Sequence, residues 1–549
     1  MRHQHVCCLE RSHNMKEVKR VFKVNGKPFF PIGSEFLNVS GYCVNDESET
    51  DEVFKSLKAA QGNTALIAVY WDQIEPEEGK FDFTSVDALL TGARRYGVRL
   101  ILLWFGTWKN GNMDFTPEWI KTNPKRFKRV LLPNGSDIWV LSPHCKANLE
   151  ADKKAFATFC KHLKVKDSTD QTVIGIQVEN EPGIIGSDRD YGPEAQADFN
   201  RPVPVKLVNG MKAAGKGTVY DLWQAAGGKK SGNWSELFNL AASELMTAWS
   251  FANYIDSVAE AGKAVYDIPM YINVWVMEQS LWTLPGKIYP SGGAVSKVLD
   301  IYKWFTPHVD MISPDDSRDF ASYKSILDSY ARDDNPLFAP ECVGGPNMFR
   351  AIADYNAIGW TAWIQISQTE DGSVHYGPKM SIDSIRCAAA VIPLLLKYQG
   401  TGKIHAVIEE ADMELQRFDF DGYVGAAVFG GGQIPITAGK DWRHSPAADW
   451  PHKHQYSAGG FGAYGLVIQA NRNEFYFVGT NYKFLLRHKN KVQSPTLKDE
   501  YMFYTLRVDE GYFDQNGEFK VNRRRNGDRI AEGVWVEPDV GVVRVIMCD

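Results

Sequence analysis

Short apolar runs bounded by turn residues recur through the first 400 residues of the chain. They lie at 29–32, 64–70, 98–105, 173–178, 270–276, 309–312, 336–339 and 358–366. Segments with helical spacing of apolar residues separate several of them, at 85–96, 151–163, 235–261, 294–305 and 322–331. Apolar runs that alternate with helical segments are typical of parallel sheets. Eight such runs predict an α/β fold, a (β/α)8 TIM barrel with insertions over residues 15–400.

The pattern changes in the last part of the chain. Short strand-like runs lie at 421–429, 464–469 and 474–478, and the pair Asn516-Gly517 between two aromatic-containing segments predicts a β-hairpin. Short strands with little helix predict a smaller all-β sandwich domain over residues 401–549. The largest barrel insertion, residues 184–232, is rich in glycine and polar residues and is expected as a long loop that helps to wall a cleft.

Composition narrows the class of protein. The chain has 549 residues, 44% of them hydrophobic and 23% charged, with a net charge of −6. This is an ordinary globular balance, and the mildly acidic charge argues against a nucleic-acid partner. The eight cysteines are scattered and show no metal-ligand spacing. We expect neither a metal nor an organic cofactor.

Targeting signals are not evident in the chain. No run approaches the roughly 18 apolar residues of a membrane span, and the N-terminus lacks the apolar region of a signal peptide. These patterns predict a soluble, cytoplasmic protein with no membrane partner, in which residues 1–14 form a disordered extension. The sequence is compatible with a homo-oligomer as well as with a monomer.

The most informative stretch is the apolar run 173–178, which ends in Glu179, Asn180 and Glu181 before a Pro-Gly pair. Charged residues are almost never buried unless paired, and active sites of barrels gather at the carboxyl ends of strands. Glu181 is therefore a candidate acid/base, and Asn180 a candidate ligand of a sugar hydroxyl. The alternative is a polar turn.

A second carboxylate is needed if the reaction is glycoside hydrolysis, and it should lie at another strand end. Glu341 fits because Pro340 ends the run 336–339 immediately before it. We predict Glu341 as the nucleophile and Glu181 as the acid/base, a pair that gives retention of configuration at a carboxyl separation of about 5–5.5 Å. The alternative for Glu341 is a surface residue that follows a strand.

The segment from Gln177 to Glu181 resembles the acid/base signature of glycoside hydrolase family 35, the retaining β-galactosidases of clan A. The segments 25–29 and 61–76 are also similar to this family, and the C-terminal domain resembles one found in a microbial branch of it. The resemblance covers residues 20–400. It implies that Glu181 is the acid/base, Asn180 a ligand of the 2-hydroxyl and Glu341 the nucleophile.

Two departures affect what the resemblance implies. Pro182 stands where the family usually has tyrosine. After the third strand the better-known β-galactosidases have a glutamate that binds galactose hydroxyls, whereas this chain has no acid in segment 106–111. The catalytic pair is therefore better supported than the sugar.

Further residues near predicted strand ends are candidates for substrate binding, with core packing as the alternative. They are Glu35, Trp108, Lys109, Asn110, Tyr271, Asn273 and Trp363. Glu179 should face away from Asn180 and pair with an arginine or lysine of the barrel. Asp315 and Asp316 are expected to cap the next helix.

Three functions remain on the sequence alone. The first is a retaining exo-β-galactosidase that acts on terminal β-galactosyl residues of oligo- or polysaccharides. The second is a related hydrolase of another glycoside, such as a β-glucoside or α-L-arabinopyranoside. The third is a non-catalytic carbohydrate-binding protein, which would have no need of both Glu181 and Glu341.

Overall fold

The structure is a computed structural model. It describes residues 21–36, 47–279, 283–315, 320–364, 367–368, 374–375, 379–410, 413, 415–429, 462–491, 502–525, 530, 533–537 and 541–548. The extension expected at residues 1–14 lies outside these ranges, as does Asp316.

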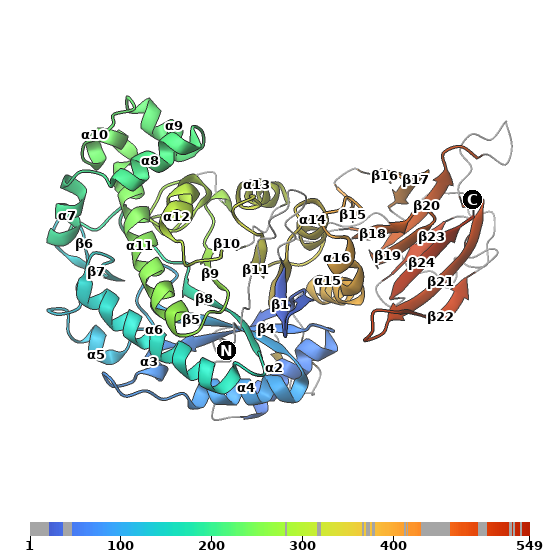
Figure 1. Ribbon diagram of the computed structural model, residues 1–549, viewed down its shortest axis with the longest axis horizontal. Helices are drawn as coiled ribbons and strands as arrows, with labels where there is room; N and C mark the ends of the chain where they lie inside the picture. Colours follow the sequence, from blue (N-terminus) through green and yellow to red (C-terminus); the bar gives the residue numbers. More distant parts are fainter. Residues whose placement is uncertain are drawn as a thin grey trace, which may run out of the picture.

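Eight parallel strands form the centre of the larger domain (Figure 1). They are β3 (Ile32–Phe36), β4 (Thr64–Tyr70), β5 (Arg99–Lys109), β8 (Val173–Asn180), β9 (Met270–Val274), β10 (Met311–Pro314), β11 (Phe338–Cys342) and β12 (Gly359–Ile364). The hydrogen-bonded order is β10-β9-β8-β5-β4-β3-β12-β11, so β10 and β11 are its two ends. The strands are almost continuously apolar because both faces of the sheet are covered. The predicted (β/α)8 barrel is confirmed.

The first barrel strand lies later in the chain than the sequence pattern indicated. Residues 27–29 belong to β2 (Lys27–Phe29), which pairs with β1 (Phe22–Val24) in a small hairpin. Phe22 packs edge-to-face on Phe338 inside the barrel, with ring centroids 5.5 Å apart. Pro31 separates this hairpin from β3, because proline has no N–H to donate to a ladder. Glu35 therefore lies on the strand itself.

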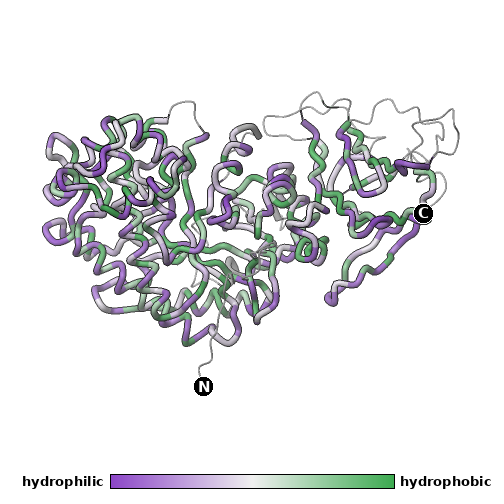
Figure 2. Tube along the Cα trace, turned by 45° about the horizontal axis from the view of Figure 1, so that its top comes forward, coloured by the Kyte–Doolittle hydropathy of each residue, from purple (hydrophilic) through white to green (hydrophobic). Residues whose placement is uncertain are grey.

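Helices cover the outside of the barrel (Figure 1). The main ones are α2 (Glu47–Ala59), α4 (Thr84–Tyr96), α6 (Lys146–Asp167), α11 (Ala242–Val265), α12 (Leu299–Phe305), α13 (Phe320–Tyr330), α14 (Pro346–Asp354), α15 (Lys379–Ala390) and α16 (Ile392–Tyr398). Figure 2 shows hydrophobic residues along the central strands and hydrophilic residues on the outer helices. Among the described residues, no helix is long and apolar enough to cross a membrane.

The large insertion after β8 is helical, so the expectation of a long loop is wrong. It contains α7 (Pro193–Asn200), α8 (Val205–Ala214) and α9 (Thr218–Ala225), and α10 (Trp234–Phe238) follows. In Figure 1 these helices form a group at the upper left, beside the outer end of α11. Each helix buries a few apolar residues, such as Leu207 and Trp223, despite the glycine-rich joints between them.

The C-terminal part consists of two antiparallel sheets. One has the order β15 (Ile404–Ile408), β18 (Tyr464–Asn471), β19 (Glu474–Thr480), β24 (Val542–Met547), β21 (Thr505–Phe513) and β22 (Phe519–Arg525). The other has β16 (Leu415–Phe420), β17 (Tyr423–Val428), β20 (Tyr482–His488) and β23 (Val534–Val536). An apolar core from both sheets lies between them. The predicted β domain is confirmed, and β21 and β22 form the predicted hairpin around Asn516-Gly517.

Apolar contacts attach this domain to the barrel. A single hydrophobic cluster runs from the barrel through α14 and α15 to the face of the six-stranded sheet that points away from the four-stranded sheet. Phe349 of α14 stacks on Tyr464 of β18, with ring centroids 5.5 Å apart.

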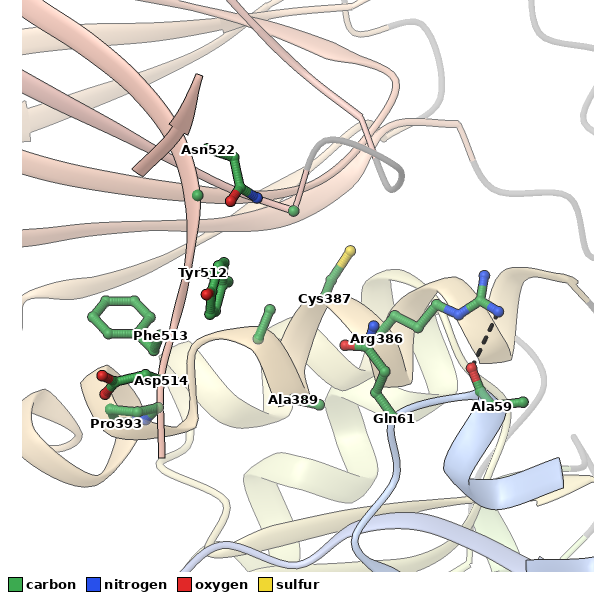
Figure 3. Close-up of a pocket in the computed structure, with 13 residues that line it drawn as sticks. Ala59, Gln61, Arg386, Cys387, Ala389, Pro393, Tyr512, Phe513, Asp514 and Asn522 are labelled. Atoms are coloured by element: carbon green, nitrogen blue, oxygen red, sulfur yellow. Dashed lines mark hydrogen bonds between the residues drawn. The ribbon is translucent and has the colours of Figure 1, made fainter. Parts of the chain in front are cut away.

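A cavity of about 750 Å³ lies beside this contact (Figure 3). Tyr512 and Asn522 line it from the β21–β22 hairpin, and Arg386 and Gln61 line it from the barrel. Gln61 precedes β4, so the cavity lies toward the end of the barrel where the strands begin.

Candidate active site

Glu181 and Glu341 meet at the carboxyl end of the barrel, as predicted. Glu181 directly follows β8, and Glu341 lies near the end of β11. One carboxyl oxygen from each, and one from Asp315 just after β10, lie within 4.8 Å of one another. Glu181 and Glu341 are half-buried, whereas Asp315 is buried. Three strands that are far apart in sequence thus bring three carboxyl groups together.

The backbone around Glu181 has an unusual conformation that directs neighbouring side chains apart. Glu179 and Glu181 have positive φ angles of 63° and 44°, which residues other than glycine rarely adopt. Such strain is tolerated only where surrounding contacts hold it, often at functional sites. Gly183 follows with a φ of 146°, and a Cβ there would lie 2.5 Å from Cβ of Pro290. This close approach requires glycine directly after Pro182.

Asn273 of β9 connects the carboxyl groups. Its Oδ1 accepts a hydrogen bond from the backbone N–H of Glu181 at 2.8 Å. Its Nδ2 donates to Asp315 Oδ2 and to Glu341 Oε1, both at 3.0 Å, and lies 3.4 Å from Asn180 Oδ1. The amide therefore fixes the position of both predicted catalytic residues.

Asn180 and Asn110 form a second polar link beside Glu181. Asn180 Oδ1 accepts a hydrogen bond from Gln177 Nε2 at 3.0 Å, and Asn180 Nδ2 donates to Asn110 Oδ1 at 3.1 Å. The backbone N–H of Asn110 donates to Asn180 O at 3.1 Å. The structure thus places both predicted binding residues next to the carboxyl cluster and orients their amides.

Glu35 and Lys109 complete the inner surface of the site. Glu35 is buried, and no N–H or O–H donor among the described residues reaches its Oε2. Burial, and then the charge of Glu341, hold the pKa of Glu35 well above its usual range, and a hydrogen bond to Glu341 also favours the protonated form of Glu35. Lys109 is the nearby cation, and its charge opposes the rise in pKa of Glu35, Glu181 and Glu341.

The two central carboxyl groups have different surroundings. Burial, and then the negative charge of Glu341, raise the pKa of Glu181 to about 7. Burial also raises the pKa of Glu341, but Lys109, the Asn273 amide and the Glu35 hydrogen bond all lower it. A group with several donors stays ionised, and one beside an anion keeps its proton. This is the division needed between a nucleophile and a general acid.

Two predicted aromatic residues lie at different depths. Tyr271 is buried inside the barrel and packs edge-to-face on Phe338 at 5.3 Å. Burial, and then the charges of Glu35, Asp315 and Glu341, hold its pKa well above the usual range, so its hydroxyl lies close to the carboxyl groups. Trp363 of β12 pairs in register with Glu35 and leaves 46% of its surface exposed. Of the two, Trp363 is the one accessible to a ligand.

The expectation for Trp108 is wrong. Its side chain is 0% exposed and packs on Phe251 and Tyr254 of α11, with ring centroids 4.4 and 4.6 Å away. The sequence placed Trp108 in a loop, but β5 continues to Lys109 and its pairing with β8 shifts register between Trp104 and Lys109. This irregularity turns Trp108 toward the helices and Lys109 toward the barrel interior.

The prediction that Glu179 pairs with an arginine or lysine is also wrong, although the Glu179 side chain does face away from Asn180. Glu179 is fully buried, and its Oε2 accepts a hydrogen bond from the backbone N–H of Trp108 at 2.7 Å. Its side-chain partner is the Asp152 carboxyl of α6 rather than an arginine or lysine. Burial, and then the charge of Asp152, hold the pKa of Glu179 well above its usual range, so a contact between two acids replaces the expected ion pair.

Sequence reasoning missed Asp315 as a member of the site and assigned it to helix capping. Its place directly after a barrel strand was the available signal, because the side chains at strand ends of a barrel converge. The run Ser-Pro-Asp-Asp is also typical of a helix start, and that interpretation concealed the signal.

Two family models match the chain. Residues 44–224 match a glycoside hydrolase family 42 model described as beta-galactosidase, and residues 386–537 match a model described as a domain of unknown function, DUF5597. The first match covers the barrel from α2 to α9, including Lys109, Asn110, Asn180 and Glu181. The second begins in α15 and covers most of the β-sandwich.

Curated relatives match a shorter part of the chain. Beta-galactosidase-1-like protein 3 of Homo sapiens is 32% identical over 194 residues, which is 33% of this chain and 27% of that protein. The Mus musculus protein of the same name is 30% identical over 177 residues, 30% of this chain and 25% of that protein. The chain thus spans about a quarter of the length of these relatives.

Solved structures similar to this chain include other glycosidases. The beta-galactosidase from Marinomonas ef1 has a TM-score of 0.44 at 12% identity and covers 64% of this chain and 58% of that one. The beta-galactosidase from Halorubrum lacusprofundi has a TM-score of 0.42 at 13% identity, with 62% and 56% covered. The family-model match to residues 44–224 and the curated relatives support a glycoside hydrolase of clan A.

Proposed function

We propose that this protein is a retaining exo-β-galactosidase that removes terminal β-galactosyl residues from oligo- or polysaccharides. Glu341 is the nucleophile and Glu181 the acid/base. The observation that carries the proposal is the approach of their carboxyl oxygens to within 4.8 Å, with a larger number of hydrogen-bond donors at Glu341 than at Glu181. That separation fits retaining enzymes, whose carboxyl groups lie about 5–5.5 Å apart, rather than inverting ones at about 6.5–9.5 Å.

The surroundings explain both steps of a double displacement. In the first, Glu341 attacks the anomeric carbon while protonated Glu181 gives its proton to the leaving oxygen. Bond formation removes the negative charge of Glu341, which is one cause of the raised pKa of Glu181. The pKa of Glu181 then falls, so in the second step Glu181 acts as the base that takes a proton from the attacking water.

Several side chains are placed to hold the sugar. Asn180 and Asn110 offer amides beside Glu181, and Lys109 offers a cation. Trp363 offers an exposed ring, and Glu35 and Tyr271 offer protonated oxygens deeper in the barrel. Asn273 acts by holding the two catalytic groups rather than the sugar.

The galactose assignment rests on the matching family model and on the resemblance to family 35. One observation favours a different sugar. Lys109 ends β5, where the better-known β-galactosidases have a glutamate that binds galactose hydroxyls, and the inner acidic residue here is Glu35 of β3. A hydrolase of another glycoside is therefore the second candidate.

The division of the chain is part of the proposal. Residues 15–400 form the catalytic unit and residues 401–549 the accessory unit, because the last barrel helix ends at Tyr398 and β15 begins at Ile404. The carbohydrate substrate is the proposed partner.

The test is hydrolysis of a panel of aryl β- and α-glycosides by the wild type and Glu341→Gln. We expect the wild type to act on the β-galactoside, with the β-anomer as the first product in proton NMR. Glu341→Gln should lose at least about 10⁴-fold in kcat, whereas Glu118→Gln on the surface should leave kcat unchanged. Inversion of configuration, or full activity of Glu341→Gln, would contradict the mechanism. Faster hydrolysis of another glycoside would change the assigned sugar and leave the proposed mechanism in place.

A further inference from the structure

Asp315 has one oxygen whose surroundings do not suit an ionised carboxylate. Oδ2 accepts a hydrogen bond from Asn273 Nδ2 at 3.0 Å. Oδ1 is buried, and no N–H or O–H donor of the described residues reaches it. A buried acceptor without a donor is costly, and native structures rarely leave one. Oδ1 therefore needs an explanation.

The neighbours of Asp315 are mainly other acids and neutral groups. The groups that face it or the adjoining carboxyls are Glu181 after β8, Glu341 of β11, Glu35 of β3, Lys109 of β5, Asn273 and Tyr271 of β9, and Tyr330 of α13. Its closest acidic neighbours are Glu181 and Glu341, with oxygens within 4.8 Å. A carboxyl group becomes a donor only when it is protonated. A proton on Oδ1 would turn the unsatisfied acceptor into a donor toward Glu181.

We propose that Asp315 is a positioning residue for the acid/base: a neutral carboxyl group that donates a hydrogen bond from Oδ1 to the Glu181 carboxylate. This inference rests on the proposed function, in which Glu181 gives and takes the catalytic proton. Asn273 would hold Asp315 through Oδ2 and Glu181 through its backbone N–H, so that the two carboxyl groups keep their relative orientation.

The electrostatics of Asp315 agree with this arrangement. Burial first, then the charges of Glu341 and Glu181, hold the pKa of Asp315 well above its usual range. The same hydrogen bond lowers the pKa of Glu181, because it stabilises the ionised form. Asp315 keeps its own proton throughout the reaction. It stabilises the carboxylate that Glu181 becomes after it has protonated the leaving oxygen.

A bound cation is the alternative explanation for the closeness of the three carboxyl oxygens. Glu181, Asp315 and Glu341 are close enough to share a metal ion, which would need Asp315 ionised. The two explanations make opposite predictions for an asparagine at this position. Its amide NH₂ can still donate to Glu181, but its neutral oxygen would be a much weaker metal ligand.

The experiment compares the pH dependence of kcat/KM for the wild type, Asp315→Asn and Asp315→Ala. Activity falls at alkaline pH when Glu181 loses its proton. Asp315→Ala removes the donor, so its alkaline limb should move up by about one pH unit. Asp315→Asn keeps a donor, so its limb should stay close to that of the wild type and its kcat should exceed that of Asp315→Ala.

The direction of the movement decides between the roles. A downward movement of the alkaline limb in Asp315→Ala would mean that Asp315 is ionised, and would overturn the proposal. If Asp315→Ala had a lower kcat but an unchanged alkaline limb, the role of Asp315 would be structural only, and this result would also overturn the proposal. Loss of wild-type activity in EDTA, together with an inactive Asp315→Asn, would favour the cation.

An infrared difference spectrum tests the protonation of Asp315 without substrate. The spectrum of the wild type minus that of Asp315→Asn at pH 7 should show the band of a protonated carboxyl group. A carboxylate band in its place would overturn the proposal. Because this readout needs no turnover, it still decides the state of Asp315 if the glycoside panel shows that the proposed function is wrong.

Discussion

Two carboxyl pairs lie on opposite sides of the same strand end, built on Glu179 and Glu181, which only Asn180 separates in the sequence. Glu181 faces the barrel interior and meets Glu341, whereas Glu179 faces the helices and meets Asp152. Burial is the largest cause of a raised pKa in all four residues. By pKa alone, the outer pair is as good a candidate for catalysis as the inner pair.

Access and the surrounding donors separate the two pairs. Glu179 and Asp152 are fully buried, and Asp152 receives hydrogen bonds from Trp104 Nε1 at 3.1 Å and Thr107 Oγ1 at 2.7 Å. Both side chains are inaccessible, so we assign the contact between these two acids to holding β5 and β8 against α6. Glu181 and Glu341 are half-buried, and Glu341 has more hydrogen-bond donors around it than Glu181 has. A perturbed pKa therefore indicates a catalytic role only together with access and a difference between the partners.

The largest expected difference is between Glu181→Gln and Glu179→Gln. For substrates with poor leaving groups, loss of the general acid should lower kcat/KM by about 10²–10⁴-fold, and azide should restore turnover of an activated aryl glycoside. Glu179→Gln can still form a hydrogen bond with Asp152, so we expect kcat/KM within a few-fold of the wild type. Steady-state kinetics with both substrates checks this, and equal losses in the two variants would refute the distinction.

The pH profile of the wild type sharpens the same comparison. Glu181 must carry its proton to act as an acid, and its pKa is raised to about 7. Activity should therefore decline as the pH rises through about 7. Glu179→Gln should leave this alkaline limb in place, because Glu179 does not exchange its proton with the substrate. A shifted limb in Glu179→Gln would mean that the two pairs are coupled.

Trp108, which faces the helices, and Trp363, which lies on the open side of the barrel, should give a smaller difference. Trp108→Ala on the helix side should lower the free energy of unfolding by about 3–5 kcal/mol, because it opens a large cavity. Trp363→Ala on the open side should change stability little and raise KM by about 3- to 10-fold. Chemical denaturation and steady-state kinetics measure the two effects. An unchanged KM in Trp363→Ala would remove it from the sugar site.

The smallest expected effect is on stability as a function of pH. The buried carboxyl groups have a higher pKa in the folded than in the unfolded protein. Their contribution to the free energy of unfolding is therefore fully present below the unfolded pKa and is lost as the pH rises through the folded pKa. For Glu181 that window runs from its usual pKa of 4.5 to about 7. The melting temperature should fall across and above this range, and Glu179→Gln should reduce the slope. A melting temperature that rises with pH would contradict the assigned directions.

The sequence alone was enough for the barrel, the β domain and the meeting of Glu181 with Glu341 at one end of the barrel. Long apolar runs at regular spacing have few other ways to be buried, and acids placed directly after such runs converge when the strands form a parallel barrel. This is why Glu181 and Glu341 could be paired across 160 residues. The resemblance to family 35 added roles for these two residues, but it could not account for the different segment after the third strand.

Only the tertiary structure decided the direction of each side chain and the direction in which the pKa of each acid is shifted. The alternation along β5 and β8 is broken by a register shift and by positive φ angles at Glu179 and Glu181. Side-chain direction therefore could not be counted from the sequence, and Trp108 was misplaced. Asp315 entered the site, and Glu179 gained an acid as its partner, because strands and helices distant in sequence meet there. Burial and charge are sums over such neighbours, which the sequence of one strand does not contain.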